Sequence, residues 1–173
     1  GLVAMGLVDV ESVTYRAKLL EVYVDGRLAD VALIDVVTCS DLWVGARAIW
    51  DPAHIREVVL ARAEPTSVGA SSVGSCLRRL GARDGLGMYL AFGEGGAEVL
   101  APIAPGLVSR VPVRSWRLLE VGDEVALTAA AATIALDGER ELEVYEGQKI
   151  AVRLTNDGPR AVDIAQCMEV AAR

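Results

Sequence analysis

Short apolar runs separated by turn dipeptides dominate this chain, a pattern typical of β-strands. The first runs are Val13–Val24 and Leu28–Val37, both rich in apolar and β-branched residues, with Asp25-Gly26 between them. Asp-Gly is a preferred two-residue hairpin turn because both central positions require positive φ. The pattern therefore predicts a long β-hairpin at the start of the chain.

The alternation of apolar runs and turns continues to the end of the chain. Asp137-Gly138 lies between Thr133–Leu136 and Leu142–Tyr145 and predicts a second hairpin. Further turns between apolar runs are predicted at Gly93–Gly96, Gly122-Asp123 and Glu146-Gly147. Strands at roughly ten-residue spacing are typical of a sandwich. We therefore predict a mainly all-β fold of two packed sheets.

Helices are predicted at two places. Asp51 is a good N-cap and Pro52 suits the first helical position, which predicts a short helix near residues 51–56. Val162–Ala172 carries apolar residues among polar ones and predicts a C-terminal helix. Pro102 and Pro105 fix an extended path that suits a wall or crossing point rather than a central strand.

Composition places the chain among single-domain globular proteins. It has 173 residues, 53% of them hydrophobic, which is enough to build a core without disulfides. The formal net charge of −7 makes nucleic acid and anionic membrane surfaces poor partners. Cys39, Cys76 and Cys167 show no metal-ligand spacing, so we expect thiols in the cytoplasm and no metal site.

Candidate chemistry is sparse when each motif is taken alone. His54, the single histidine, has no nucleophile that the sequence assigns to it and is interpreted as a capping or surface residue. The small-residue run Thr66–Ser75, followed by arginines, has two interpretations. It is either a plain loop or a loop that lets a ribose or phosphate approach backbone amides.

Four segments, in their order and spacing, resemble the C-terminal domain of the NAD kinase superfamily, most closely its acetoin-catabolism protein X branch. They are Ala32–Val37, Pro65–Gly74, Ala101–Gly106 and Ile134–Glu141. The resemblance covers nearly the whole chain. It implies that residues 1–173 form a single NAD kinase-like C-terminal β domain.

The resemblance also implies site residues, position by position. Asp35 matches the acid of the family's Leu-Asn-Glu or Leu-Asn-Asp segment, although Ile34 replaces its Asn. Ser72 and Gly74 match the later part of the family's pocket-lining Thr-Gly-Ser-Thr-Ala-Tyr…Ser-x-Gly-Gly run, whose Thr-Gly-Ser-Thr part and Tyr have no counterpart in this sequence. Gly106 stands where NAD kinases commonly carry His.

The turn Asp137-Gly138-Glu139 is similar to the Asp-Gly-Gln or Asp-Gly-Glu of the superfamily. The resemblance thus implies nucleotide or substrate contacts at Asp35, Ser72, Gly74, Asp137 and Gly138. Glu139 is the candidate catalytic acid or base, because the related lipid kinases use the corresponding Glu.

The implied activity of a longer protein is ATP- or polyphosphate-dependent phosphorylation of NAD or a related small molecule, with NAD, ATP and Mg²⁺ as ligands. The family's Gly-Gly-Asp-Gly motif is missing, since Gly95-Gly96 is followed by Ala97. We therefore expect a separate N-terminal domain as partner, a fragment that is inactive alone, and homo-oligomers. Two alternatives are a non-catalytic metabolite- or nucleotide-binding module and a kinase for a lipid or polyol hydroxyl.

Overall fold

The computed structural model describes residues 1–39, 54–128 and 132–172. Strands predominate among these residues, as predicted. The described elements, in chain order, are the 3-10 helix η1 (Glu11–Val13), β1 (Thr14–Arg16), β2 (Leu19–Val24), β3 (Arg27–Ala32), β4 (Asp35–Cys39), β5 (Ile55–Leu60), α1 (Ala70–Leu77), β6 (Leu86–Ala104), β7 (Leu107–Glu120), β8 (Glu124–Leu127), β9 (Ala132–Leu136), β10 (Arg140–Val144), β11 (Ile150–Thr155), β12 (Arg160–Val162) and α2 (Ile164–Ala171).

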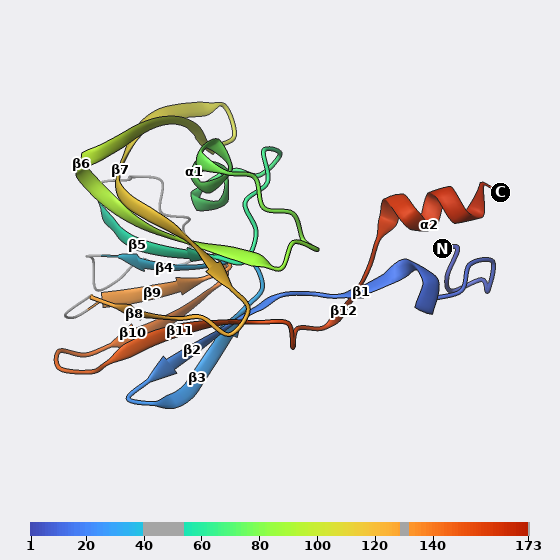
Figure 1. Ribbon diagram of the computed structural model, residues 1–173, viewed down its shortest axis with the longest axis horizontal. Helices are drawn as coiled ribbons and strands as arrows, with labels where there is room; N and C mark the ends of the chain where they lie inside the picture. The colour runs from blue at the N-terminus through green and yellow to red at the C-terminus, as the bar shows by residue number, and fades with distance from the viewer. Residues whose placement is uncertain (40–53, 129–131, 173) are drawn as a thin grey trace.

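The strands form antiparallel sheets of six, four and two strands. The six-stranded sheet has the order β10-β9-β4-β5-β6-β7, and the four-stranded sheet has the order β3-β2-β11-β8. Strands β1 and β12 pair with each other and lead away from the larger sheets toward α2 and the N-terminus (Figure 1). We call residues 1–17 and 158–172 the arm. The predicted pair of packed sheets is confirmed, and the arm is an addition to it.

Two hydrophobic cores hold the body together. Leu20 and Val152 of the four-stranded sheet pack with Val36 and Ile134 of the six-stranded sheet in the first core. The second core lies on the other face of the six-stranded sheet, under α1, where Val73 packs with buried strand residues. The two cores thus lie on opposite faces of the six-stranded sheet, and burial of their apolar side chains stabilises the body.

The first predicted hairpin is confirmed at its turn and corrected at its far end. Asp25 and Gly26 have φ of 50° and 76° and join β2 to β3. The second strand does not run on to Val37, because β3 ends at Ala32 and β4 begins at Asp35 in the other sheet. Residues 33 and 34 therefore carry the chain from one sheet to the other, a step that the run of apolar residues hides.

The predicted turn at Gly93–Gly96 is wrong. Strand β6 is continuous from Leu86 to Ala104, and the glycines form a bulge at which Phe92 and Ala97 both face Val113 of β7. A Cβ on Gly96 would lie 2.2 Å from the carbonyl oxygen of Val113. Glycine is required there because β7 approaches the backbone closely, which is a common reason for glycine inside a strand.

The two proline positions fit the expectation for non-central strand positions. Pro102 lies within β6 opposite Val108 of β7, whereas β5 pairs with β6 between Met88 and Ala91. Among the described strands, β6 thus has a neighbour on one side at Pro102, where a missing N–H is tolerated. Pro105-Gly106 forms the turn into β7, with Gly106 at φ 77°.

The helices differ from the prediction at two places. Residues 51–53 of the predicted helix near 51–56 lie outside the described residues; His54 has 3-10 helical geometry, as predicted, but Ile55 and Arg56 already belong to β5, so the helix does not continue to 56. Helix α1 forms within the run predicted as a loop. The C-terminal helix is confirmed as α2, whose N-cap Asp163 accepts a hydrogen bond from the amide of Gln166.

Candidate functional site

Asp137, in the turn between β9 and β10, holds the chain crossing between the two sheets. Its Oδ1 accepts hydrogen bonds from the backbone amides of Leu33 at 3.0 Å, Ile34 at 2.7 Å and Asp35 at 3.2 Å. Its own amide donates to the carbonyl oxygen of Asp35 at 3.0 Å. The carboxylate that the family resemblance assigns to a ligand thus accepts hydrogen bonds from backbone amides of this chain. Its role in this structure is to fix the position of Asp35.

Asp35, the first residue of β4, has a carboxyl group in an unusual environment. It lies opposite Leu60 of β5, and its side chain makes no hydrogen bond or ion pair with any described residue. Two effects raise the pKa of Asp35 from 3.8 to about 6: burial is the larger, and the negative charge of Asp137 is the smaller. A carboxyl group that is largely buried, has a raised pKa and has no structural partner is a candidate for ligand binding.

Glu139 and Gly138 lie on the same turn as Asp137. Asp137 and Gly138 have φ of 55° and 69°, the left-handed pair that a type I′ turn requires. The amide of Glu139 closes the turn on the carbonyl of Leu136 at 3.1 Å, and its side chain is exposed. The structure therefore places Asp35, Asp137, Gly138 and Glu139 together, and the catalytic role of Glu139 stays a prediction.

Ser72 and Gly74 lie on α1 and face the sheet rather than solvent. The Ser72 hydroxyl lies 2.7 Å from the carbonyl oxygen of Gly69 and 2.8 Å from that of Pro102. A Cβ on Gly74 would lie 2.4 Å from Cδ1 of Leu60, so a larger residue would require the Leu60 side chain or the helix to shift. Both residues have packing roles, and their ligand contacts stay predictions.

The four segments of the family resemblance meet in two pairs. Pro65–Gly74 contacts Ala101–Gly106 through Ser72 and Pro102, and Ala32–Val37 contacts Ile134–Glu141 through Asp137. Leu60 connects the pairs, because it lies opposite Asp35 and against Gly74. Asp35 therefore belongs to the face of the six-stranded sheet that α1 covers.

Glu57 is a buried carboxylate that the sequence analysis did not single out. Its Oε1 accepts a hydrogen bond from the Tyr89 hydroxyl at 2.6 Å, and its Oε2 accepts from the amide of Thr128 at 2.7 Å. Burial, and then this hydrogen bond, raise the pKa of Tyr89 to about 12. Both carboxylate oxygens are occupied by the protein, so Glu57 connects β5 to β6 and to Thr128, the residue after β8, and is not a candidate for ligand binding.

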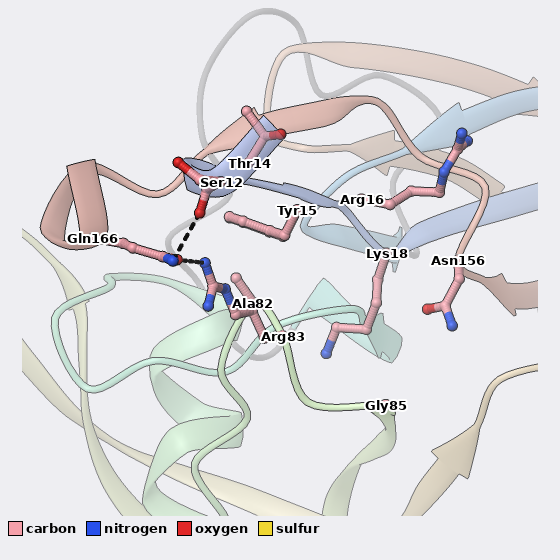
Figure 2. A pocket seen from close by; sticks show the side chains of 10 residues that line it. All are labelled: Ser12, Thr14, Tyr15, Arg16, Lys18, Ala82, Arg83, Gly85, Asn156 and Gln166. Atoms are coloured by element: carbon pink, nitrogen blue, oxygen red, sulfur yellow. Dashed lines mark hydrogen bonds between the residues drawn. The ribbon is translucent and has the colours of Figure 1, made fainter. Parts of the chain in front are cut away.

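A cavity of about 480 Å³ lies where the arm joins the body. Its lining residues are Ser12, Thr14, Tyr15, Arg16, Lys18, Ala82, Arg83, Gly85, Asn156 and Gln166. Figure 2 shows Lys18 directed between the Ala82–Arg83 segment and Gly85, with the side chains of Arg83 and Gln166 meeting beside Ser12. Arg83 is one of the arginines that follow the small-residue run Thr66–Ser75; no motif in the sequence marks the other lining residues.

The described residues carry no helix long and apolar enough to cross a membrane. They also contain no group of three or more His, Cys, Asp or Glu side chains placed to hold a metal ion.

Comparison with known proteins gives two matches. A family model described as the acetoin catabolism protein X C-terminal domain matches residues 18–157. Acetoin catabolism protein X of Cupriavidus necator is 36% identical over 180 aligned positions, which cover 100% of this chain and 50% of that protein. The chain thus spans about half the length of the curated relative that it matches. The matched region contains Asp35, the Asp137 turn and α1.

Proposed function

Because this chain belongs to the acetoin catabolism protein X C-terminal domain family, we propose that it is the acceptor-side domain of a kinase that phosphorylates NAD or a related small molecule. The phosphate donor in this proposal is ATP or polyphosphate. The observation that supports it is the Asp35 carboxyl group, which has a raised pKa and no partner among the described residues. Perturbed carboxyl groups of this kind are concentrated at functional sites.

Asp35 would act as a hydrogen-bond acceptor for a hydroxyl of the ligand. With a pKa of about 6 it is mainly a carboxylate at pH 7, and a hydrogen bond to a carboxylate is stronger than one between neutral groups. Ile34, which replaces the family's Asn, offers no polar side-chain atom beside it. In this chain the contact to the acceptor therefore depends mainly on Asp35, whereas an NAD kinase that carries Asn at the position of Ile34 has a second polar side chain there.

The phosphate donor and its metal ion are assigned to another part of the protein. The resemblance implies an N-terminal domain with a Gly-Gly-Asp-Gly motif, and phosphoryl transfer depends on positioning and on cationic stabilisation of the phosphates. In this proposal the chain described here binds and orients the acceptor. Glu139 would accept the proton that the hydroxyl group of the acceptor loses.

A second candidate is a metabolite- or nucleotide-binding domain without catalysis. The exposure of the Glu139 side chain favours it, because general acids and bases are usually tuned by partial burial or charged neighbours. The two candidates share the ligand contact at Asp35. They differ in whether ATP is consumed.

We expect a protein of the full length of the Cupriavidus relative, carrying this domain, to form ADP from ATP in the presence of NAD. The variant Asp35→Asn should lower kcat/KM for the acceptor at least about tenfold, the loss of one charge-assisted hydrogen bond. The exposed Glu94→Gln in the β6 bulge serves as the control and should leave the rate unchanged. ADP release can be followed with a coupled assay. Failure to phosphorylate any nucleotide acceptor with either ATP or polyphosphate would refute the kinase and leave the second candidate, a binding domain without catalysis.

A further inference from the structure

The cavity at the root of the arm has a charge opposite to that of the chain. The chain carries 24 acidic and 17 basic residues, yet the lining contains Arg16, Lys18 and Arg83 and no acidic residue. Its volume of about 480 Å³ falls within the range of small-molecule sites, roughly 300 to 1,000 Å³. The lining is otherwise made of hydroxyl, amide and backbone groups. These features suit a small anion.

Lys18 is the most unusual of the lining residues. Its side chain is 4% exposed, and Nζ donates to the carbonyl oxygens of Gly81 at 3.1 Å and Leu86 at 2.5 Å. An ammonium group has three N–H donors, so these contacts leave one donor available. Lys18 makes no ion pair with a described residue, and burial is the first cause that lowers its pKa to about 8. A buried ammonium group without an ion pair is expensive; Asp84 and Glu64 offset part of this cost by attraction over a longer distance, and a bound anion in contact with Nζ would compensate the charge more fully.

Arg83 is held in place by its neighbours. Its guanidinium group forms an ion pair with Asp163 at 2.7 Å, donates to Oε1 of Gln166 at 2.8 Å and lies 5.1 Å from the centre of the Tyr15 ring. Asp163 compensates its charge. Arg83 therefore fixes the wall of the cavity and connects the arm to the body.

Arg16 adds a second positive charge that nothing described compensates. It lines the cavity on the side of Asn156, it is exposed, and it makes no ion pair or hydrogen bond through its side chain with a described residue (Figure 2). Figure 2 shows the Arg16 side chain directed away from the Lys18 ammonium group, so this exposed side chain must turn into the cavity for the two residues to supply two charges to one ligand. A dianionic phosphate matches them, whereas a carboxylate matches one.

We propose that this cavity binds the phosphate group of a small phosphorylated metabolite, through Lys18 and Arg16, with Tyr15 and Asn156 as neutral donors. None of the lining residues lies in the four segments that carry the kinase proposal. The phosphate site and the kinase proposal can therefore fail separately.

Calorimetric titration of the chain with inorganic phosphate tests the proposal. We expect saturable binding at pH 7.5, and binding at least about tenfold weaker in Arg16→Gln, whose exposed side chain has no role in the cores. Arg27→Gln, at the tip of the β2–β3 hairpin, removes the same charge away from the cavity and should bind like the wild type. No phosphate binding, or equal binding by Arg16→Gln, overturns the site. Acetate binding as tight as phosphate overturns the assignment to phosphate.

A pH series with sulfate, whose charge stays constant between pH 7 and 9.5, tests the part of Lys18. The charged groups that act on Lys18 are Asp84, Arg62 and Glu64, with Arg16 and Arg83 in the same cavity. Sulfate affinity should fall as pH rises through about 8, because the ammonium group loses its proton. Lys18→Met should bind sulfate more weakly at pH 7 and lack this decline. The same decline in sulfate affinity in Lys18→Met would overturn the role of Lys18. If that variant does not fold, a sulfate affinity of the wild type that does not change between pH 7 and 9.5 would overturn it.

Discussion

Replacing Asp137 by alanine is expected to lower the free energy of unfolding by about 3 kcal/mol. The carboxylate accepts hydrogen bonds from the amides of Leu33, Ile34 and Asp35, and its removal leaves these donors without their acceptor at the crossing between the sheets. A hydrogen bond to a charged group contributes about 1.5 to 3 kcal/mol. The three amides share one carboxylate, so we expect the combined loss to lie near the upper end for a single bond rather than at the sum of three. Alanine also tolerates the positive φ of 55° less well than aspartate. Urea unfolding at pH 7 measures the change.

Asp25→Ala is the matched control for Asp137→Ala. Asp25 is the first residue of the other Asp-Gly turn, with φ 50°, and its Oδ1 accepts a hydrogen bond from the amide of Lys149 at 3.0 Å. This variant should lose about 1 kcal/mol, since it removes the same side chain from the same turn with fewer backbone partners. Equal losses in the two variants would contradict the view that Asp137 holds the crossing.

Replacing Asp35 by asparagine is expected to stabilise the chain at pH 7 by about 2 kcal/mol. The folded-state pKa of Asp35 is raised to about 6 from 3.8, so folding favours the protonated form. A carboxyl group with a raised pKa contributes its stability below the unfolded-state pKa and loses it as pH rises through the folded-state value. Each unit of such a shift corresponds to about 1.4 kcal/mol, and partial exposure reduces the full effect. The asparagine amide carries no charge to desolvate.

The pH dependence separates this effect from a change in packing. Urea unfolding of the wild type and of Asp35→Asn should give similar stabilities near pH 4 and diverge between pH 4 and 6, with the variant more stable above pH 6. The difference between the two curves isolates Asp35 from the other carboxyl groups. A variant that is less stable than the wild type at pH 7 would show that the carboxylate has a structural partner.

Turn chemistry made the body of the fold predictable from the sequence. Asp25-Gly26 and Asp137-Gly138 both adopt the positive φ that Asp-Gly hairpins require, and the apolar runs beside them form paired strands. Such signals are local, so a single sequence contains them. The family resemblance added Asp35, which the pattern of apolar residues does not distinguish from its neighbours.

The features that were missed depend on tertiary contacts. Helix α1 forms from small residues of modest helix propensity because Gly74 lets it lie against Leu60, and packing outweighs propensity there. The β6 bulge depends in the same way on the approach of β7 to Gly96. The cavity joins residues 12–18 to residues 82–85, 156 and 166, which no spacing rule connects.

The central claim is that Asp35 contacts the ligand, and calorimetric titration of this chain with NAD, beside Asp35→Asn, tests it most directly. We predict saturable binding by the wild type at pH 7.5 and at least about tenfold weaker binding by the variant, since one charge-assisted hydrogen bond is lost. The higher stability expected of Asp35→Asn would exclude unfolding as the cause of weaker binding. Equal NAD affinity in the two proteins, or no binding of NAD, NADP or ATP by the wild type, would contradict the account.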